Sequence, residues 1–444
     1  MYHCSRLNVE KGIMTFCRTQ IRRSLRWKYQ SKRRIVATCP FLLAASVLAV
    51  TYHDQATHGF EKESLSHRFY LMKRKYTICE SEGESKSDTV DAEVSQSIKS
   101  EAHCRLDSTT KRWYLYKGIM NPASAKDLRI FKCSDTPLAD EIAHYLGVSL
   151  NSMQIGKFVD DETKIVIDEN VRGCRVYVIC STTNVDRIVE LLLTISAMRR
   201  SWAKSITTVI PFYGYGRQDR MHKGREPIAA ADIAEMLQVM GVDHVITIDL
   251  HSAQIEGFFR PTVPVDNLQA YPIGSYYFAE KQLKNPVVVA PHSSAVNRAV
   301  LFSDILSQQT DESIPVAFVI RKHHVLDQPF GELVGNVKGM DAIIVDNLVD
   351  TGDTLMKTAK VLKQHGARTI SAFCVHGRFS SNAVEKLIAC EDLDTIVTTN
   401  TIPNSPSDGS ATSSDKIITL SVAPFLAQMI TSMHTNGSST LRFE

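Results

Sequence analysis

The sequence predicts an α/β protein with two domains, each built on a mainly parallel sheet flanked by helices. From residue 128 onward, short apolar segments bounded by turn residues alternate with amphipathic segments. Continuous apolar strands of this kind are typical of parallel sheets covered on both faces. The alternation pauses near Asn267 to Tyr276 and restarts at Pro286, which predicts one domain over 126–270 and a second over 271–444. The length of 444 residues allows two domains and a further segment.

The expected elements follow from the spacing of apolar residues. In the first domain we expect strands around 129–131, 176–179, 206–212 and 245–249, and helices at 137–146, 185–199 and 228–240. In the second we expect strands at 287–290, 316–320, 342–346, 369–374 and 395–398, with a helix that begins at Leu355. Gly241 is expected to end the helix before it, because glycine readily takes the left-handed conformation that closes helices.

The first 125 residues differ from the rest in composition. Residues 1–34 hold ten Lys or Arg and one acid, or +9, so the remainder sums to −6 against a total of +3. A basic, acid-poor start before the apolar stretch 41–50 suits a mitochondrial-type transit peptide, a membrane anchor or an unstructured extension. The stretch is shorter than the roughly 20 residues of a membrane span. We therefore expect a leader at 1–55, a polar and largely disordered linker at 56–125, and a cytoplasmic or organellar protein.

Composition also excludes some classes of function. A mildly acidic body argues against nucleic acid as a partner. The ten cysteines include no C-x-x-C pair and no Cys/His spacing of the zinc type. We therefore expect the cysteines to be reduced thiols of an intracellular protein.

A carboxylate and an imidazole follow the expected strand at 245–249. In Asp249-Leu250-His251 they stand two residues apart, where both can face one cation. Ligands of open α/β sheets bind at the carboxyl ends of strands, and Mg²⁺ prefers oxygen ligands with an occasional histidine. Taken alone, the pair is equally consistent with a buried histidine bonded to an aspartate.

A basic loop follows the expected strand at 206–212. It contains Arg217, Gln218 and Asp219. Arginine pairs with two phosphate oxygens at once, so the loop is a candidate clamp for a polyphosphate. A solvated surface loop is the alternative interpretation.

Acids and a Gly/Thr turn follow the strand at 342–346. The run is Asp346-Asn347-Leu348-Val349-Asp350-Thr351-Gly352-Asp353-Thr354. Backbone N–H groups at a helix N-terminus bind phosphate, and acids at the strand end can accept hydrogen bonds from sugar hydroxyls. A simple helix cap would explain Thr351 or Thr354 singly, but not the whole run.

Together these segments, with Phe258-Phe259 and Val265-Asp266-Asn267, resemble the ribose-phosphate pyrophosphokinase (phosphoribosyl pyrophosphate synthetase) family over about 128–444. The resemblance implies two tandem domains of the type I phosphoribosyltransferase kind. It also implies transfer of pyrophosphate from ATP to the anomeric hydroxyl of ribose 5-phosphate, with AMP as the second product and a role in nucleotide biosynthesis. Family members assemble as dimers and hexamers, so the implied partners include further copies of the chain or a paralogue.

The resemblance also implies roles for individual residues. The ATP-binding residues would be Phe158, Asp160, Glu162, Arg217, Gln218 and Asp219. The metal ligands for Mg²⁺, the implied cofactor, would be Asp249, His251 and Asp266. The ribose 5-phosphate site would hold Asp346, Asp350, Thr351, Gly352, Asp353 and Thr354. The catalytic residues would be Arg217 and Lys322, the latter on the loop after the strand at 316–320.

The sequence departs from the family pattern at positions expected to face ligands. Asp161 and Asp353 replace glycines, Asn347 replaces an acid, and His292 replaces an aspartate in Pro291-His292-Ser293-Ser294-Ala295. An aspartate after Phe259 is lost, and residues 260–264 are inserted in its region. Asp353 in particular is expected to repel the 5-phosphate by its charge. An alternative is therefore a catalytically weak or inactive regulatory paralogue that assembles with active subunits. A phosphoribosyltransferase is disfavoured, because such an enzyme needs no ATP site.

Overall fold

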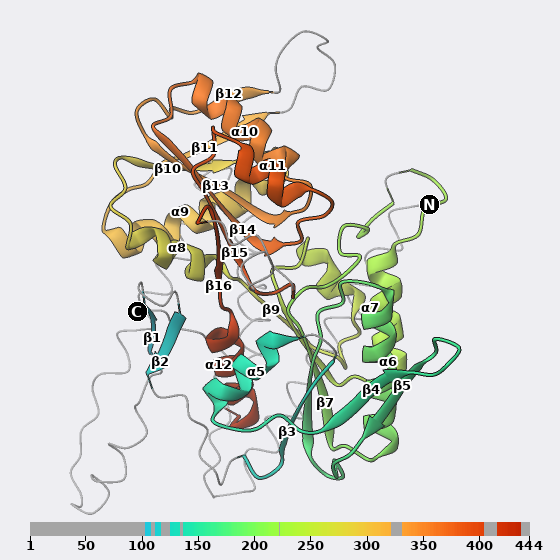
Figure 1. Cartoon of the computed structure of the whole chain (residues 1–444). Coiled ribbons are helices and arrows are strands. Elements are labelled where there is room, and N and C mark those ends of the chain that lie inside the picture. The colour runs from blue at the N-terminus through green and yellow to red at the C-terminus, as the bar shows by residue number, and fades with distance from the viewer. Residues whose placement is uncertain are drawn as a thin grey trace, which may run out of the picture. The chain divides into compact units, whose positions relative to one another are not determined.

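The computed structural model describes residues 103–107, 112–116, 125–133, 136–221, 223–320, 331–403 and 415–436 (Figure 1). The chain divides into two units, Met1–Ala92 and Glu93–Glu444, and every described residue belongs to the second. The leader expected at 1–55 and most of the linker expected at 56–125 lie outside the described residues. Within the described ranges, no helix has the length and apolar character to cross a membrane.

The first sheet is fully parallel and has five strands in the order β3-β6-β7-β8-β9. These strands are β3 (Leu128–Lys132), β6 (Arg175–Ile179), β7 (Ser205–Ile210), β8 (His244–Ile248) and β9 (Val265–Leu268). Its helices are α5 (Pro137–Leu146), α6 (Val185–Arg200) and α7 (Ala229–Met240), and the 3₁₀ turn η1 (Ala253–Phe258) follows β8. The strands and helices expected here are confirmed, with bounds that differ by two residues or fewer.

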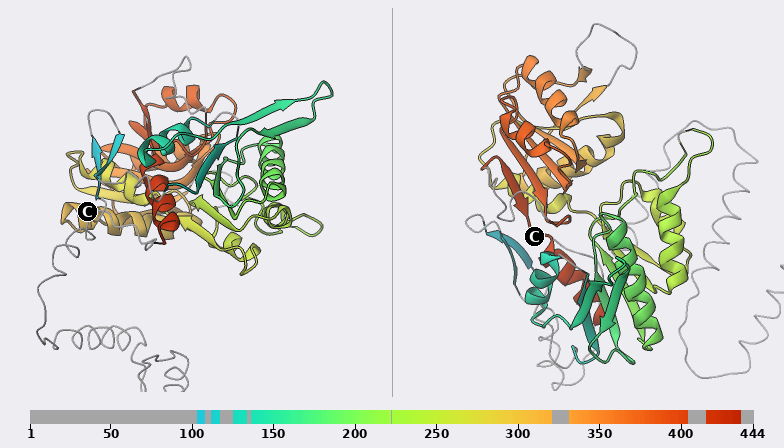
Figure 2. Two further views of the ribbon diagram at one scale, coloured as in Figure 1. Left: turned by 90° about the horizontal axis from the view of Figure 1, so that it is seen from below. Right: turned by 45° about the vertical axis from the view of Figure 1, so that its right-hand side comes forward.

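Two antiparallel hairpins stand outside this sheet. One pairs β4 (Met153–Lys157) with β5 (Thr163–Ile167); it packs beside α6, and its far end projects from the domain (Figure 2). The other pairs β1 (His103–Asp107) with β2 (Arg112–Tyr116), in a segment where the sequence predicted only a linker.

The second sheet has seven strands in the order β12-β11-β10-β13-β14-β15-β16, all parallel except β12. The strands are β10 (Pro286–Ala290), β11 (Val316–Ile320), β12 (Glu332–Val334), β13 (Asp341–Val349), β14 (Thr369–Gly377), β15 (Thr395–Thr399) and β16 (Ile417–Leu420). The helices are α8 (Tyr271–Ala279), α9 (Val296–Thr310), α10 (Asp353–Gln364), α11 (Ala383–Ala389) and α12 (Ala423–His434), with the 3₁₀ turn η2 (Ser293–Ala295) before α9. The predicted fold class, two mainly parallel sheets flanked by helices, is confirmed.

Local sequence explains where some helices begin and end. The Asn184 side chain accepts a hydrogen bond from the Arg187 amide and so caps α6. Gly241 ends α7 with φ of 97°, as predicted. β13 is longer than expected, because Leu348 and Val349 continue the ladder with β14 beyond the polar pair Asp346-Asn347.

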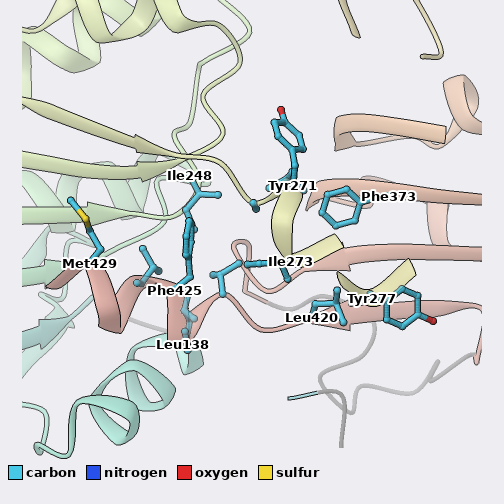
Figure 3. Close-up of a cluster of buried hydrophobic side chains, with 14 of the residues drawn as sticks. Leu138, Ile248, Tyr271, Ile273, Tyr277, Phe373, Leu420, Phe425 and Met429 are labelled. Atoms are coloured by element: carbon cyan, nitrogen blue, oxygen red, sulfur yellow. The ribbon is translucent and has the colours of Figure 1, made fainter. Parts of the chain in front are cut away.

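One apolar cluster connects the two sheets (Figure 3). It contains Leu138 and Ile248 from the first domain, Phe373 and Leu420 from the second sheet, Tyr271, Ile273 and Tyr277 from α8, and Phe425 and Met429 from α12. Separate clusters cover the opposite faces, with α6 and α7 on the first sheet and α10 and α11 on the second. Because both sheets share one close-packed layer, their carboxyl ends are held in a fixed relation.

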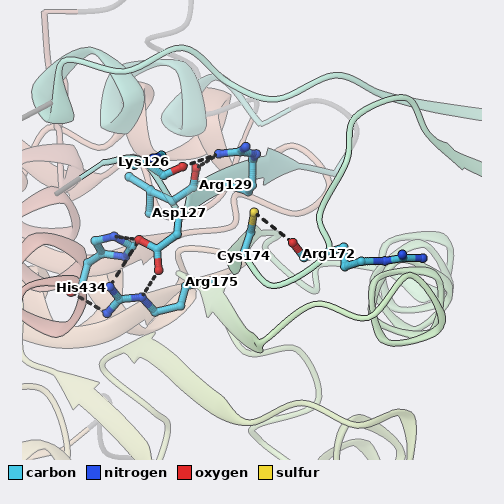
Figure 4. Close-up of polar contacts among 8 residues, drawn as sticks. Lys126, Asp127, Arg129, Arg172, Cys174, Arg175 and His434 are labelled. Carbon is cyan, nitrogen blue, oxygen red and sulfur yellow. Dashed lines mark hydrogen bonds and ion pairs between the residues drawn. The ribbon is translucent and has the colours of Figure 1, made fainter. Parts of the chain in front are cut away.

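Helix α12 contacts the first domain through polar and charged groups as well as through apolar packing. The Asp127 carboxylate accepts hydrogen bonds from Arg175 Nε at 3.1 Å and lies 3.2 Å from His434 Nε2 (Figure 4). Arg175 Nη1 also donates to the His434 carbonyl at 2.6 Å. Partial burial alone would raise the pKa of Asp127, but hydrogen bonding and charge from Arg175 outweigh it and lower that pKa. α12 thereby completes the layer next to α5.

We predict that Gly274→Ala destabilises the protein although it adds a good helix former to α8. A Cβ atom at Gly274 would lie 2.5 Å from Phe373 Cε2 in the shared layer. The overpacking is expected to outweigh the gain in helix propensity and to cost about 1–3 kcal/mol of unfolding free energy in denaturant titration. The control is Gly257→Ala, where the added atom meets nothing within 4 Å. Equal stability of the two variants would show that α8 and Phe373 do not pack this closely.

Candidate active site

The carboxyl ends of both sheets open into one cleft of about 650 Å³. The first domain contributes Arg217, Asp219, Asp249 and His251 to its walls. The second domain contributes His292, Asp346, Asp350, Thr351, Gly352 and Thr354. An adjoining cavity of about 410 Å³ adds Gln218 and His376. The structure thus brings the three segments that we predicted to bind ligands, which follow β7, β8 and β13, together around these two adjoining cavities.

Some predicted site residues lie elsewhere. Phe158, Asp160 and Glu162 are on the turn between β4 and β5, are exposed, and line neither cavity. Asp266 pairs with Ile246 in the strand register, and its carboxylate is 2.6 Å from His244 Nε2 rather than beside Asp249. Lys322 lies outside the described residues.

Asp249 is buried in a strained backbone conformation at the end of β8. Its φ is 43°, in the left-handed region that costs a non-glycine residue on the order of 1–3 kcal/mol in a constrained site. Its Oδ2 accepts a hydrogen bond from the Ala270 amide at 2.7 Å. Burial raises the pKa of Asp249 to about 6, against the opposing effect of bonds from Ala270 and Tyr271.

His376, for which we predicted no role, contacts this strained segment. Its Nε2 lies 3.2 Å from the Asp249 carbonyl oxygen and its Nδ1 2.8 Å from Thr401 Oγ1. A carbonyl only accepts, so Nε2 carries the proton and Nδ1 accepts from the Thr401 hydroxyl. Burial lowers the pKa of His376 to about 4, so the ring is neutral. The ring follows the expected end of the strand at 369–374, which is the signal that could have pointed to it.

His251 and its neighbours set the charge at the centre of the cleft. Arg298 Nη2 donates to the His251 carbonyl at 2.6 Å, and partial burial followed by the charge of Arg298 lowers the pKa of His251. A neutral imidazole is the form that ligates metals. In the part of the chain that the structure describes, no three His, Cys, Asp or Glu side chains form a ready metal site. Mg²⁺ does not need three protein ligands, because it commonly uses one or two and completes its shell with water and substrate phosphates. Asp249 and His251 are therefore compatible with Mg²⁺.

The acids at the end of β13 have nitrogen partners. Asp350 Oδ2 lies 2.8 Å from Arg217 Nη1, which joins the two domains across the cleft. Partial burial would raise the pKa of Asp350, but bonds from Ser380 and Arg217 outweigh this and lower it. Asp346 Oδ2 is 3.2 Å from His292 Nε2, and its Oδ1 accepts from the Asn347 amide.

The loop from Thr351 to Thr354 leads into α10 and presents the helix N-terminus. Gly352 has φ of 80°, and a Cβ atom there would be 2.9 Å from Leu387 Cγ, so both backbone and space demand glycine. This end of a 12-residue helix has no side-chain cap hydrogen bond and borders the main cleft, which suits it to a phosphate.

Comparison with known proteins agrees with this geometry. Residues 128–241 match the model for the N-terminal domain of ribose phosphate pyrophosphokinase, and 303–444 match the phosphoribosyl synthetase-associated domain. The ribose-phosphate pyrophosphokinase of Oceanobacillus iheyensis is 38% identical over 331 residues, which are 72% of this chain and 99% of that protein. The chain belongs to the ribose-phosphate pyrophosphokinase family.

Further relatives support this assignment to the pyrophosphokinase family. The enzyme of that name from Wolinella succinogenes is 40% identical over 315 residues, covering 70% of this chain and 97% of that protein. The crystal structure of phosphoribosylpyrophosphate synthetase from Mycobacterium smegmatis superposes with a TM-score of 0.63 at 33% identity, over 70% of this chain and all of that one. The pyrophosphokinase fold, of the type I phosphoribosyltransferase kind, is therefore shown for the part from about residue 128.

Among the departures from the pyrophosphokinase pattern, Asp353 lies within the expected 5-phosphate loop but outside the lining of the main cleft. It is the first residue of α10, is exposed, and lines a cavity of about 270 Å³ together with Lys357 and with Thr351 and Thr354 of the loop. An acid in the first turn also favours the helix dipole. Solvent screens an exposed charge, which weakens the repulsion expected between Asp353 and a bound 5-phosphate.

We predict that Asp249→Asn stabilises the magnesium-free protein at neutral pH. The raised pKa means that Asp249 contributes stability below pH 3.8, which is lost as pH rises through about 6. The variant should gain up to about 3 kcal/mol over wild type at pH 7, and the gain should fade between pH 6 and 4. Chemical denaturation in EDTA at several pH values measures this, and a gain independent of pH would contradict the assigned burial.

We predict that Asp353→Gly changes the affinity for ribose 5-phosphate by less than about twofold, while lowering stability by about 1 kcal/mol. The reason is the position of Asp353 in the first turn of α10, outside the main cleft. Calorimetric titration and thermal unfolding measure the two effects. A tenfold or greater tightening would restore the repulsion hypothesis.

Proposed function

We propose that the chain is a ribose-phosphate diphosphokinase, which converts ATP and ribose 5-phosphate to phosphoribosyl pyrophosphate and AMP. The observation that carries this proposal is the cleft in which the Arg217 loop and Asp249-x-His251 face the Asp/Thr/Gly loop of α10. A polyphosphate site and a sugar-phosphate site are thus within reach of one another. Such a reaction needs chiefly positioning and charge neutralisation, and both substrates can be held here.

On the nucleotide side, Arg217, Gln218 and Asp219 form the proposed ATP loop. Asp249 and His251 are the proposed ligands of Mg²⁺, together with phosphate oxygens; Asp266, the third ligand suggested by the resemblance, is bonded to His244. When bound, the cation neutralises charge on the triphosphate. To bind phosphate oxygens, Arg217 must give up its bond with Asp350. Nucleotide binding would therefore also release the Asp350 carboxylate.

On the ribose side, Asp346 and Asp350 accept hydrogen bonds from the sugar hydroxyls. The backbone from Thr351 to Thr354 holds the 5-phosphate at the N-terminus of α10. The anomeric oxygen attacks the β-phosphorus, its proton leaves to solvent or a nearby base, and AMP departs. Lys322 is the proposed second cation for the transferred group.

The β4–β5 turn supports an oligomer. If Phe158, Asp160 and Glu162 contact ATP, they do so from a second copy, because they line no part of the cleft in their own chain. The exposed Phe158 ring, half of whose surface is open, suits stacking on a base supplied by the neighbour. A dimer that assembles further to a hexamer is the proposed state.

The second candidate is a regulatory paralogue that assembles with active subunits. It is favoured by His292 and Asn347, which replace acids inside the cleft, and by the Asp249 carboxylate, which bonds to Ala270. For either candidate we propose that the leader directs the protein to an organelle of the mitochondrial type or to a membrane.

We predict that the full chain releases AMP when given Mg-ATP and ribose 5-phosphate, in equal amount to phosphoribosyl pyrophosphate. Arg217→Ala should lower kcat by about 10²–10³, the usual cost of one lost charge-stabilising group. Arg200→Ala, on the exposed end of α6, is the control and should leave the rate unchanged. Binding of both substrates without AMP release would favour the paralogue.

A further inference from the structure

Both acids of the proposed ribose site are already paired with nitrogen donors of the protein. Asp346 Oδ2 is 3.2 Å from His292 Nε2, and Asp350 Oδ2 is 2.8 Å from Arg217 Nη1. All four side chains line the same cleft. Two carboxylates at one sugar site would otherwise repel each other in a partly desolvated setting. The protein therefore supplies from its own side chains the compensation that such a pair needs.

The hydrogen bonds of His292 fix how its ring is used. Its Nδ1 lies 2.8 Å from Ser294 Oγ, at the start of η2, and its Nε2 faces the carboxylate. A carboxylate only accepts, so Nε2 bears a proton. A serine hydroxyl can either donate or accept, so both contacts of the ring can be hydrogen bonds whichever form Nδ1 takes.

The paired carboxylates keep acceptor capacity for a ligand. Each aspartate has about four lone-pair positions. Asp346 uses one on Oδ1 for the Asn347 amide and one on Oδ2 for His292, and it lines the cleft. His292 thus holds the carboxylate in place while leaving it free to accept from vicinal hydroxyls. The phosphate of the same ligand has its own site at the N-terminus of α10.

We infer that the ribose half of the cleft binds ribose 5-phosphate without a divalent cation, with His292 as the positioning residue for Asp346. This rests on the proposed function, because it concerns the sugar-phosphate site of that reaction. Mg²⁺ then enters with the nucleotide alone. His292, which departs from the family pattern, is in this account a substitute that keeps the ribose site competent.

The test is calorimetric titration of the full chain with ribose 5-phosphate, without nucleotide, in excess EDTA and in saturating Mg²⁺. The dissociation constants in the two buffers are expected to agree within about twofold. Binding only in Mg²⁺, or tightening by tenfold or more in Mg²⁺, overturns the inference and leaves the proposed function standing. Absence of binding in both buffers overturns the proposed function and the inference together.

Variants separate the role of His292 from general effects on the fold. His292→Leu should weaken binding in EDTA by at least about tenfold, the loss expected for one hydrogen bond to a charged group. Part of that loss should return in Mg²⁺, because a cation can replace the missing donor. His292→Gln keeps an N–H donor and should retain more of the affinity than leucine. His365→Leu makes the same change on the exposed end of α10 and should have no effect. Equal affinity of the His292→Leu variant and wild type in EDTA would remove His292 from the site.

Discussion

The shared apolar layer between the two sheets is the constraint on which the site depends. The cleft needs both domains, because the proposed nucleotide segments follow strands of the first sheet and the proposed ribose segments follow strands of the second. Phe373, α8 and α12 fill the space between them at close-packed density. The polar contacts between the two domains, such as Arg217 with Asp350 and Ser181 with the Thr401 carbonyl, can form only because that layer fixes the distance.

The cleft combines a strained backbone with side chains whose pKa values are shifted. Asp249 combines a left-handed backbone with a buried carboxylate, and a neutral His376 from the other sheet bonds to its carbonyl. Such features persist only where the surroundings over-determine them, and they cluster at functional positions.

The fold was predictable because its signals are local. Apolar runs located the central strands, and Gly241 located the end of α7. The sequence also predicted which segments would meet, since strand carboxyl ends lie at one edge of a parallel sheet. It could not show that the main cleft is lined by Thr354 but not by Asp353, or that Asp266 bonds to His244, because these depend on side-chain direction and on strand register. His376 was missed because its partners, Asp249 and Thr401, are far away in the sequence.

The return of α12 to the first sheet has a consequence for how the protein is made. Residues 423–434 are synthesised after every strand of the second sheet, yet Phe425 and Met429 belong to the layer that covers β3, β8 and α5. The first domain is therefore synthesised long before its apolar face can be covered by its own chain. Contacts of such long sequence separation form slowly, and a nascent chain with this face open is prone to association. A truncation that removes α12 would therefore destabilise the first domain as well as the second.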